Sequence, residues 1–400
     1  MTNAKAGSVW KVVIAVAALG FVAREMLAWI SYGSADIGIM QYIARSIQAE
    51  GLLELYRRDV GHNHTPLTSL ACVVVQWISV ITRLPFPFVF KQPLIICDAM
   101  VCVLLWKIWL HRTCDRMRAA IVVAAYAWCP IAILLGAHHG NVDPIYAMLC
   151  LLAAYVIDRH RAWFLGGLVL GAAINVKLIP VLLVPVLAAL CRDRRELQRL
   201  IAALAIMSIP FLAMLAIERS IFVRNVIQYQ SFTDYWGINL FLKEASRQPR
   251  FSAVAQTLMY EYFDRGRWIL LGAIGLLAIM ARRKKLSAIE ASACTAAIFL
   301  ILTPGFGLQY LAFAAPLLFA VRLAPAVRYG ISAGLFALFN YWLNWPGGFP
   351  IDSTGIATPP RAPGAQFGLL AWAVLVTFVT LEVRGQRSEV RKSNPSSPDL

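Results

Sequence analysis

Charged residues are scarce in this sequence. Asp, Glu, Lys and Arg make up only 14% of its 400 residues, whereas 60% are hydrophobic, and soluble globular domains carry roughly 25% charged residues. This scarcity excludes a water-soluble fold. The apolar residues form long runs, and a helix needs about 20 of them to cross a bilayer core about 30 Å thick, so the sequence predicts an all-α polytopic membrane protein.

Paired cysteines are also lacking. The eight cysteines are scattered, mostly inside apolar runs, and no two of them form a C-x-x-C pair. This spacing argues against a metal site and against a disulfide framework, and it is typical of small apolar packing residues. We therefore expect neither a metal nor another cofactor.

Acidic residues are few beside the basic ones, with 21 Asp and Glu against 37 Lys and Arg, which gives a formal net charge of +16. In a soluble protein this charge would indicate nucleic acid. Here the basic residues gather between the apolar runs, at 111–118, 158–161, 192–199, 282–285 and 384–392. Such a pattern marks cytoplasmic loops, so we expect both termini in the cytoplasm, membrane lipids as neighbours and no nucleic-acid partner.

This assignment places the other connecting segments on the extracytoplasmic side. They are 31–66, 138–143, the neighbourhood of 177, 219–265, 304–309 and 346–366. Between 67 and 110 an odd number of crossings is required, and either three short helices or one crossing plus a re-entrant piece would fit. We predict about 12 to 14 transmembrane helices in one domain, 1–383, with no internal repeat, followed by a disordered cytoplasmic tail, 384–400.

The first extracytoplasmic loop, 31–66, opens with an acid. From Ile37 to Leu52 apolar residues recur at helical spacing, which predicts an amphipathic helix on the membrane surface with Asp36 at its N-terminal end. Asp36 would cap this helix. It would also be placed to take a proton from an acceptor hydroxyl, and both roles are compatible.

The same loop ends in the polar run 61–68. Its His62 and His64, spaced i and i+2, could ligate a metal, but no acidic or cysteine cluster lies near them in the sequence. Hydrogen bonding to a phosphate or a sugar is therefore the favoured interpretation. Polar capping of the following helix is the alternative.

A second polar group occupies the short turn 136–144. Asp143 followed by Pro144 is a good helix start, but this does not account for His138, His139 and Asn141 in the same turn. Polar side chains at membrane depth are costly and tend to be functional. We therefore expect these residues to bind substrate.

Lys177 stands alone in an apolar stretch. It would either snorkel to the membrane surface or face a pocket, where its charge would suit a lipid-linked phosphate. Weaker candidates for substrate binding are Arg224, Tyr229, Trp236 and Gln309. The aromatic residues among them would stack on a sugar or mark the membrane interface.

The order of these features resembles the GT-C membrane glycosyltransferases. The resemblance rests on the acid of the first loop, Thr65-Pro66-Leu67, Ile95-Ile96-Cys97-Asp98, the turn at 136–141 and Ala173-Ile174-Asn175-Val176-Lys177. It is closest to the bacterial polyprenyl-phosphate-mannose mannosyltransferases and the dolichyl-phosphate-glucose glucosyltransferases. The segments 229–240 and 304–310 resemble the bacterial group.

The resemblance implies a GT-C-like bundle in a bacterial inner membrane. It also implies inverting transfer of a hexose, of mannose or glucose type, from a polyprenyl-phosphate sugar to a lipid or glycan acceptor at the extracytoplasmic face. Asp36 would be the general base, and Lys177, His138 and His139 would lie near the donor phosphate. The alternatives are a membrane transporter or lipid flippase, which would use charges such as Asp98 at mid-membrane depth, and a membrane subunit without chemistry of its own.

Overall fold

The computed structural model describes residues 3–59, 61–229, 231–232, 236–344 and 362–384. Within these residues the chain is helical apart from short turns and loops, and its only β contact is an isolated bridge between Phe232 and Phe306. The prediction of an all-α protein is confirmed. The predicted tail from 385 onward, and most of the predicted segment 346–366, lie outside the described residues.

The helices of the first half lead from the N-terminus to the middle of the chain. They are α1 (Asn3–Ile30), α2 (Ala35–Glu50), α3 (Leu52–Arg58), α4 (Pro66–Thr82), α5 (Phe86–Thr113), α6 (Arg116–Ala127), α7 (Pro130–Ile133), the π-helix η1 (Leu134–His139), α8 (Asp143–His160), α9 (Trp163–Val176), the 3-10 helix η2 (Ile179–Leu182), α10 (Leu183–Leu190) and α11 (Arg194–Met207).

The second half continues in the same way. Its helices are α12 (Ile209–Ile217), α13 (Arg219–Phe222), the π-helix η3 (Val223–Ile227), α14 (Gly237–Ser246), α15 (Ser252–Lys284), α16 (Ala288–Leu302), the 3-10 helix η4 (Leu308–Tyr310), α17 (Leu311–Val321), α18 (Leu323–Asn344) and α19 (Ala362–Val383).

Three segments of the described chain are long and apolar enough to cross a membrane, namely Val9–Ile30, Phe86–Thr113 and Gly364–Val383. Two further pairs, Arg116–Ala127 with Pro130–His139 and Arg194–Met207 with Ile209–Ile217, would each cross as one span bent by 49° and 48°. Five shorter apolar helices accompany them. The chain is a polytopic membrane protein, and the predicted number of crossings stays a prediction.

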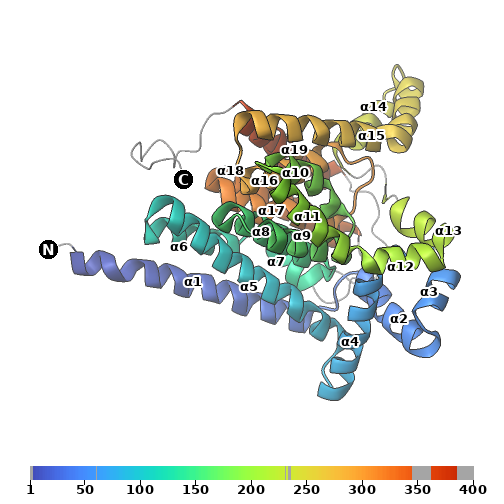
Figure 1. The fold of residues 1–400 in the computed structure, drawn as a ribbon, viewed down its shortest axis with the longest axis horizontal. Helices are drawn as coiled ribbons and strands as arrows, with labels where there is room; N and C mark the ends of the chain where they lie inside the picture. Colours follow the sequence, from blue (N-terminus) through green and yellow to red (C-terminus); the bar gives the residue numbers. More distant parts are fainter. Residues whose placement is uncertain (1–2, 60, 230, 233–235, 345–361, 385–400) are drawn as a thin grey trace.

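The helices form a bundle with a buried centre (Figure 1). Helix α17 runs through this centre, and every one of its residues is buried. In the view of Figure 1 the N-terminus lies at the left, α2, α3 and α13 lie together at the right-hand end, and α14 lies apart from them at the top right. The predicted extracytoplasmic loop thus lies at one end of the bundle together with the segment that follows α12.

The segment 67–110 forms two helices rather than three. They meet at Arg83, whose φ of 59° breaks the helical path. In Figure 1, α5 runs alongside α1 whereas α4 points away from both. Helix α4 buries polar Ser69 and Gln76 and exposes apolar Val74 and Trp77, as suits a helix in contact with lipid. The structure thus has neither three short helices nor a re-entrant piece set apart from α4 and α5, and the number of crossings in this segment stays a prediction.

A buried ion pair joins α1 to α5. Nε of Arg24 lies 3.3 Å from Oδ2 of Asp98, and Tyr126 donates its hydroxyl to the other carboxylate oxygen at 2.7 Å. Arg24 also donates to the carbonyl oxygens of Gly20 and Ala127. The second of these lies at the bend between α6 and α7, where helix carbonyls lose their usual partners. Asp98 therefore stabilises the bundle in a pair with Arg24.

Candidate active site

One cavity of about 770 Å³ opens at the end of the bundle that carries α2. Its walls come from six separate stretches of the chain. They are the start of α2, residues 59 and 61–65, the turn at 139–141, the segment 176–182, residues 226–229 with 231–232, and the turn 303–310. Single residues of three further helices, Arg267, Phe299 and Asn340, complete the wall. Of the predicted site residues, Asp36, His62, His64, His139, Asn141, Lys177, Tyr229 and Gln309 line it.

Asp36 lies in the first turn of α2, and its side chain is 28% exposed. The cap of this helix is Ser34, whose hydroxyl accepts a hydrogen bond from the backbone N–H of Asp36 at 3.2 Å. The capping interpretation of Asp36 is therefore wrong. Because Ser34 supplies the cap, the Asp36 carboxylate is left for other contacts.

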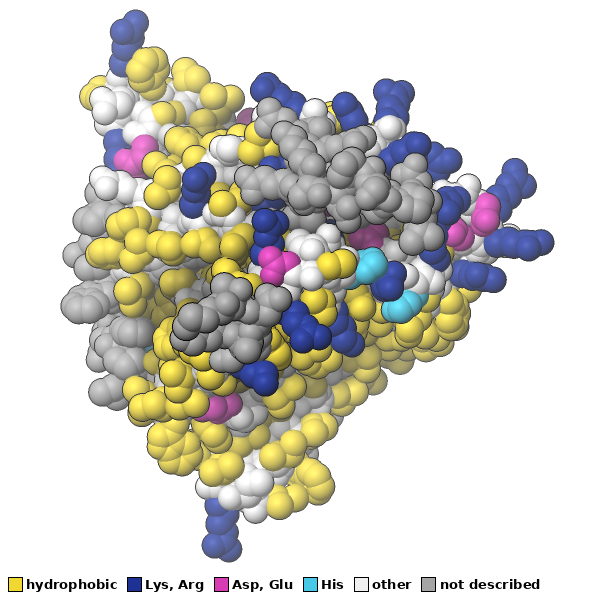
Figure 2. Space-filling view, turned by 90° about the vertical axis from the view of Figure 1, so that its left-hand side faces the viewer, with side chains coloured by type: hydrophobic (Ala, Val, Ile, Leu, Met, Phe, Trp, Pro, Cys, Tyr) yellow, Lys and Arg dark blue, Asp and Glu magenta, His cyan; other side chains and the backbone are white. Residues whose placement is uncertain are grey.

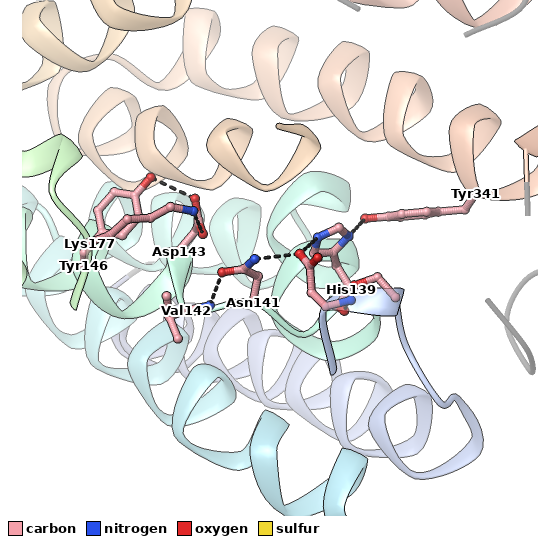
Figure 3. Close-up of polar contacts among 9 residues, drawn as sticks. His139, Asn141, Val142, Asp143, Tyr146, Lys177 and Tyr341 are labelled. Atoms are coloured by element: carbon pink, nitrogen blue, oxygen red, sulfur yellow. Dashed lines mark hydrogen bonds and ion pairs between the residues drawn. The ribbon is translucent and has the colours of Figure 1, made fainter. Parts of the chain in front are cut away.

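Those contacts converge on one carboxylate oxygen. Oδ2 of Asp36 lies 3.1 Å from Nε2 of His139 and accepts a hydrogen bond from the amide of Asn141 at 2.6 Å (Figure 3). Among the described residues no hydrogen bond reaches Oδ1. One oxygen is thus held by the protein, and the other is left for a donor that enters the cavity.

Burial by itself would raise the pKa of Asp36. The hydrogen bonds from His139 and Asn141 and the positive charge of Lys177 oppose this effect, and the pKa of Asp36 lies well below its usual value. Asp36 is therefore ionised at neutral pH. In this form a carboxylate can accept a proton.

The backbone around His139 is tied to the start of α2. The backbone N–H and the hydroxyl of Ser34 both donate to the His139 carbonyl, at 3.0 and 2.7 Å. The π-helix η1 ends at Gly140, whose φ is 73°, and a Cβ atom there would lie 2.3 Å from the Ile37 side chain. Only glycine combines this backbone with such close packing.

Lys177 lies at the C-terminal end of α9, on the wall of the cavity. Its ammonium is 2.8 Å from Oδ2 of Asp143, and Tyr146 donates its hydroxyl to Oδ1 of the same carboxylate at 2.9 Å (Figure 3). The ammonium also lies 4.8 Å from the ring centre of Tyr310. Lys177 is 18% exposed while Asp143 is fully buried, so the cavity meets the cation and not its partner.

The two histidines of the first loop differ in their surroundings. His62 is buried, with Nε2 3.0 Å from the hydroxyl of Ser69, and burial lowers its pKa to about 4. Burial, with the nearby charges of His62 and Lys177, lowers the pKa of His64 to about 3. Both imidazoles are therefore neutral at pH 7 and can only exchange hydrogen bonds with a ligand. No three His, Cys, Asp or Glu side chains of the described residues gather as a metal site requires.

Four predicted binding residues do not line the cavity. His138 is buried with its ring 4.8 Å from that of Tyr341, and Asp143 supports Lys177 from behind. Arg224 donates to the neighbouring Asn225 and faces solvent. Trp236 is buried, stacks on Phe306 and donates to the Leu300 carbonyl. The geometry gives these side chains structural contacts.

The structure adds one residue that the sequence did not indicate. The hydroxyl of Tyr341, on α18, lies 2.9 Å from Nδ1 of His139. The two residues are 202 positions apart, and Tyr341 belongs to an apolar helix in which a tyrosine is an ordinary packing residue. No local pattern could have pointed to it.

Comparison with known proteins gives one result. The family model of Glycosyltransferase family 87 matches residues 66–304, which is more than half of the chain. No curated protein matches the sequence of this chain. The matched stretch contains His139, Asn141, Asp143 and Lys177, whereas Asp36, Gln309 and Tyr341 lie outside it.

Proposed function

Since the chain belongs to glycosyltransferase family 87, and is thus a membrane-bound glycosyltransferase, we propose that it moves a hexose of mannose or glucose type from a polyprenyl-phosphate sugar to a lipid or glycan acceptor. One observation carries the proposal. A single cavity holds an ionised carboxylate, Asp36, and an ammonium group, Lys177. The family membership does not favour the transporter alternative.

The walls of the cavity suit a lipid-linked donor. Apolar Val181, Ile227 and Phe232 line it and are 41%, 47% and 62% exposed. Such side chains would accommodate isoprene units next to a polar head group. Lys177 and neutral His64 would hold the phosphate, and Asn141, Tyr229 and Gln309 would contact the sugar or the acceptor.

The reaction needs little from the protein beyond placement and charge. The acceptor oxygen forms a bond to C1 of the sugar, from the face opposite the phosphate, while the C1–O bond to the phosphate breaks and its electron pair stays on that oxygen. Asp36 takes the acceptor proton as general base. Lys177 stabilises the negative charge that develops on the departing phosphate.

We further propose that the cavity faces the extracytoplasmic side of a bacterial inner membrane, in one domain spanning 1–383. The basic residues of the predicted cytoplasmic loops support this orientation. Figure 2 shows the face that is opposite the α2 end of the bundle, and dark-blue Lys and Arg side chains outnumber the magenta acidic ones on it. Arg282, Arg283 and Lys284 also end α15, as expected for the cytoplasmic end of a membrane helix.

The test is sugar transfer by the purified protein in nanodiscs, with polyprenyl-phosphate mannose or glucose and a panel of lipid and glycan acceptors. Asp36→Asn is expected to lower kcat by more than about 100-fold while donor binding is kept. The matched control is Asp59→Asn, because Asp59 is another carboxylate of the cavity wall, with its oxygen accepting from the backbone of Gly61. If Asp36→Asn were as active as wild type, Asp36 would not be the general base. If the wild-type protein bound no polyprenyl-phosphate sugar, the proposed donor would be wrong.

A further inference from the structure

Three polar groups from three separate helices form a row that leads away from the cavity. Oδ2 of Asp36 on α2 meets Nε2 of His139 on η1 at 3.1 Å, and Nδ1 of the same imidazole meets the hydroxyl of Tyr341 on α18 at 2.9 Å. His139 is 5% exposed and Tyr341 is fully buried. Figure 3 shows the Tyr341 hydroxyl pointing toward the His139 ring. Both ring nitrogens are thus engaged, on opposite sides of the ring.

The chemistry of the outer groups decides which way the protons point. An ionised carboxylate only accepts hydrogen bonds, so Nε2 of His139 must carry a proton toward Asp36. A phenol hydroxyl can donate, so Nδ1 can accept from Tyr341, and this pattern satisfies all three groups with a neutral imidazole. Tyr341 then selects the tautomer of His139 that can donate to Asp36.

We propose that His139 and Tyr341 are positioning residues for the general base: Tyr341 holds the tautomer of His139, and His139 holds the Asp36 carboxylate ionised and turned with one oxygen toward the cavity. This inference deepens the proposed function and rests on it for its catalytic consequence. His139 was expected to bind substrate from its sequence. It lines the cavity, but both nitrogens of its ring contact protein groups, Asp36 and Tyr341, and the proposal therefore gives it a positioning role.

The polar groups around Asp36, His139 and Tyr341 also favour an ionised Asp36. Asn141 donates to the same oxygen of Asp36, and the charge of Lys177 acts on that carboxylate from α9. The ring of His138 packs against Tyr341, and Lys91 approaches from α5 with its ammonium 2.7 Å from the Ser31 carbonyl. Among the residues that the structure describes, Asp36 is the only acidic side chain that these helices place beside His139 and Tyr341. The lowered pKa of Asp36 agrees with this arrangement.

The arrangement also links the catalytic loop to a distant part of the chain. Tyr341 lies beyond the stretch matched by the family model, and it reaches His139 because α18 packs against α7 and η1. The two bonds from Ser34 to the His139 carbonyl fix the backbone on the other side. The imidazole is therefore held at its backbone and at both ring nitrogens.

A direct test reads the imidazole itself and needs no substrate. The chain has six histidines, so nitrogen-15 NMR of histidine-labelled protein in nanodiscs can resolve His139, assigned with a His139→Gln variant. We expect the Nε2–H tautomer in wild type at neutral pH and a shift of both nitrogen signals in Tyr341→Phe. The control is Tyr329→Phe, because Tyr329 is also fully buried on α18 and donates to the Leu311 carbonyl at 2.8 Å. A doubly protonated imidazole, the Nδ1–H tautomer, or equal spectra of both tyrosine variants would overturn the proposal.

The second readout is the pH profile of sugar transfer. Removing a hydrogen bond to a charged group raises the pKa of Asp36, so the acid limb of kcat should move up by about one to two pH units in His139→Ala. His139→Gln keeps an N–H donor and should restore most of the lost activity, and Tyr341→Phe should shift the limb less than His139→Ala. An unmoved limb in an active His139→Ala variant would refute the positioning role while leaving the glycosyltransferase proposal intact.

Discussion

The ammonium of Lys177 lies 2.8 Å from Oδ2 of Asp143, a carboxylate that is fully buried and also accepts the hydroxyl of Tyr146. The pair joins the end of α9 to the start of α8. Of the two side chains, only Lys177 is exposed to the cavity. Since Asp143 cannot move toward solvent, Lys177 is held at a fixed point of the wall, where a departing phosphate would meet a preorganised charge.

Replacing Lys177 by glutamine should lower kcat for sugar transfer by about 100- to 1000-fold, the usual cost of losing one preorganised group that stabilises developing charge. Arginine should not restore the rate, because its planar fork does not reproduce the point charge of lysine. The measurement is steady-state transfer in nanodiscs. Lys285→Gln, at an exposed position at the end of α15, serves as the control, and a rate loss of equal size in both variants would contradict the role of Lys177.

Asp143→Asn should destabilise the protein more than Tyr146→Phe does. The asparagine leaves the Lys177 charge without its carboxylate, and breaking such a pair by removing one partner costs about 3–5 kcal/mol. Tyr146→Phe removes one hydrogen bond to the carboxylate, which costs about 1.5–3 kcal/mol. Thermal unfolding of the two variants in the same detergent gives the comparison. Equal shifts in Tm would show that the ion pair adds nothing beyond the hydrogen bond.

Stability should fall as the pH is lowered from about 6.5 toward 4 because of His62. Its pKa is lowered to about 4 in the folded protein, so in this pH window the unfolded chain binds a proton that the folded chain does not. His62→Gln should flatten the dependence of Tm on pH. His160→Gln is the control, since His160 is exposed at the end of α8, and an unchanged slope in His62→Gln would rule His62 out as the source.

Gly140→Ala should abolish transfer and lower Tm. The added Cβ would lie 2.3 Å from the side chain of Ile37, and φ at this position is 73°. Gly51→Ala is a matched control, because its φ is 90° but nothing lies within 4 Å of the added Cβ. It carries the backbone strain without the clash. If both variants lost activity equally, close packing of the turn against α2 would not be what the site requires.

Arg24→Met should strongly destabilise the bundle, by about 3–5 kcal/mol, because it leaves the buried Asp98 carboxylate without its cation. Changing both residues, as Arg24→Met with Asp98→Asn, should recover part of the loss, since neither charge then stays unpaired. Unfolding by denaturant in detergent measures both. A double variant no more stable than Arg24→Met would show that the pair does not act as a unit.

The sequence by itself determined the class of the protein and where its site would form. Long apolar runs can satisfy their backbone groups in a bilayer only as helices, so composition alone implied a helical membrane protein. The apolar spacing after Asp36 predicted the helix α2, and it forms at Ala35–Glu50. Asp36, His139, Asn141 and Lys177 stood out because polar residues at membrane depth are costly, and they line one cavity.

The tertiary structure alone decided how these residues act. The sequence could not tell that Ser34 caps α2, that His138 is buried against Tyr341 while His139 contacts Asp36, or that Asp98 pairs with Arg24. Nor could it bring Tyr341 to a histidine 202 positions away. The local sequence pattern indicates where a helix forms and which of its faces is apolar. Which faces of distant helices meet is settled by packing among many side chains at once, and a hydrogen bond between them depends on atomic positions that only the assembled bundle defines.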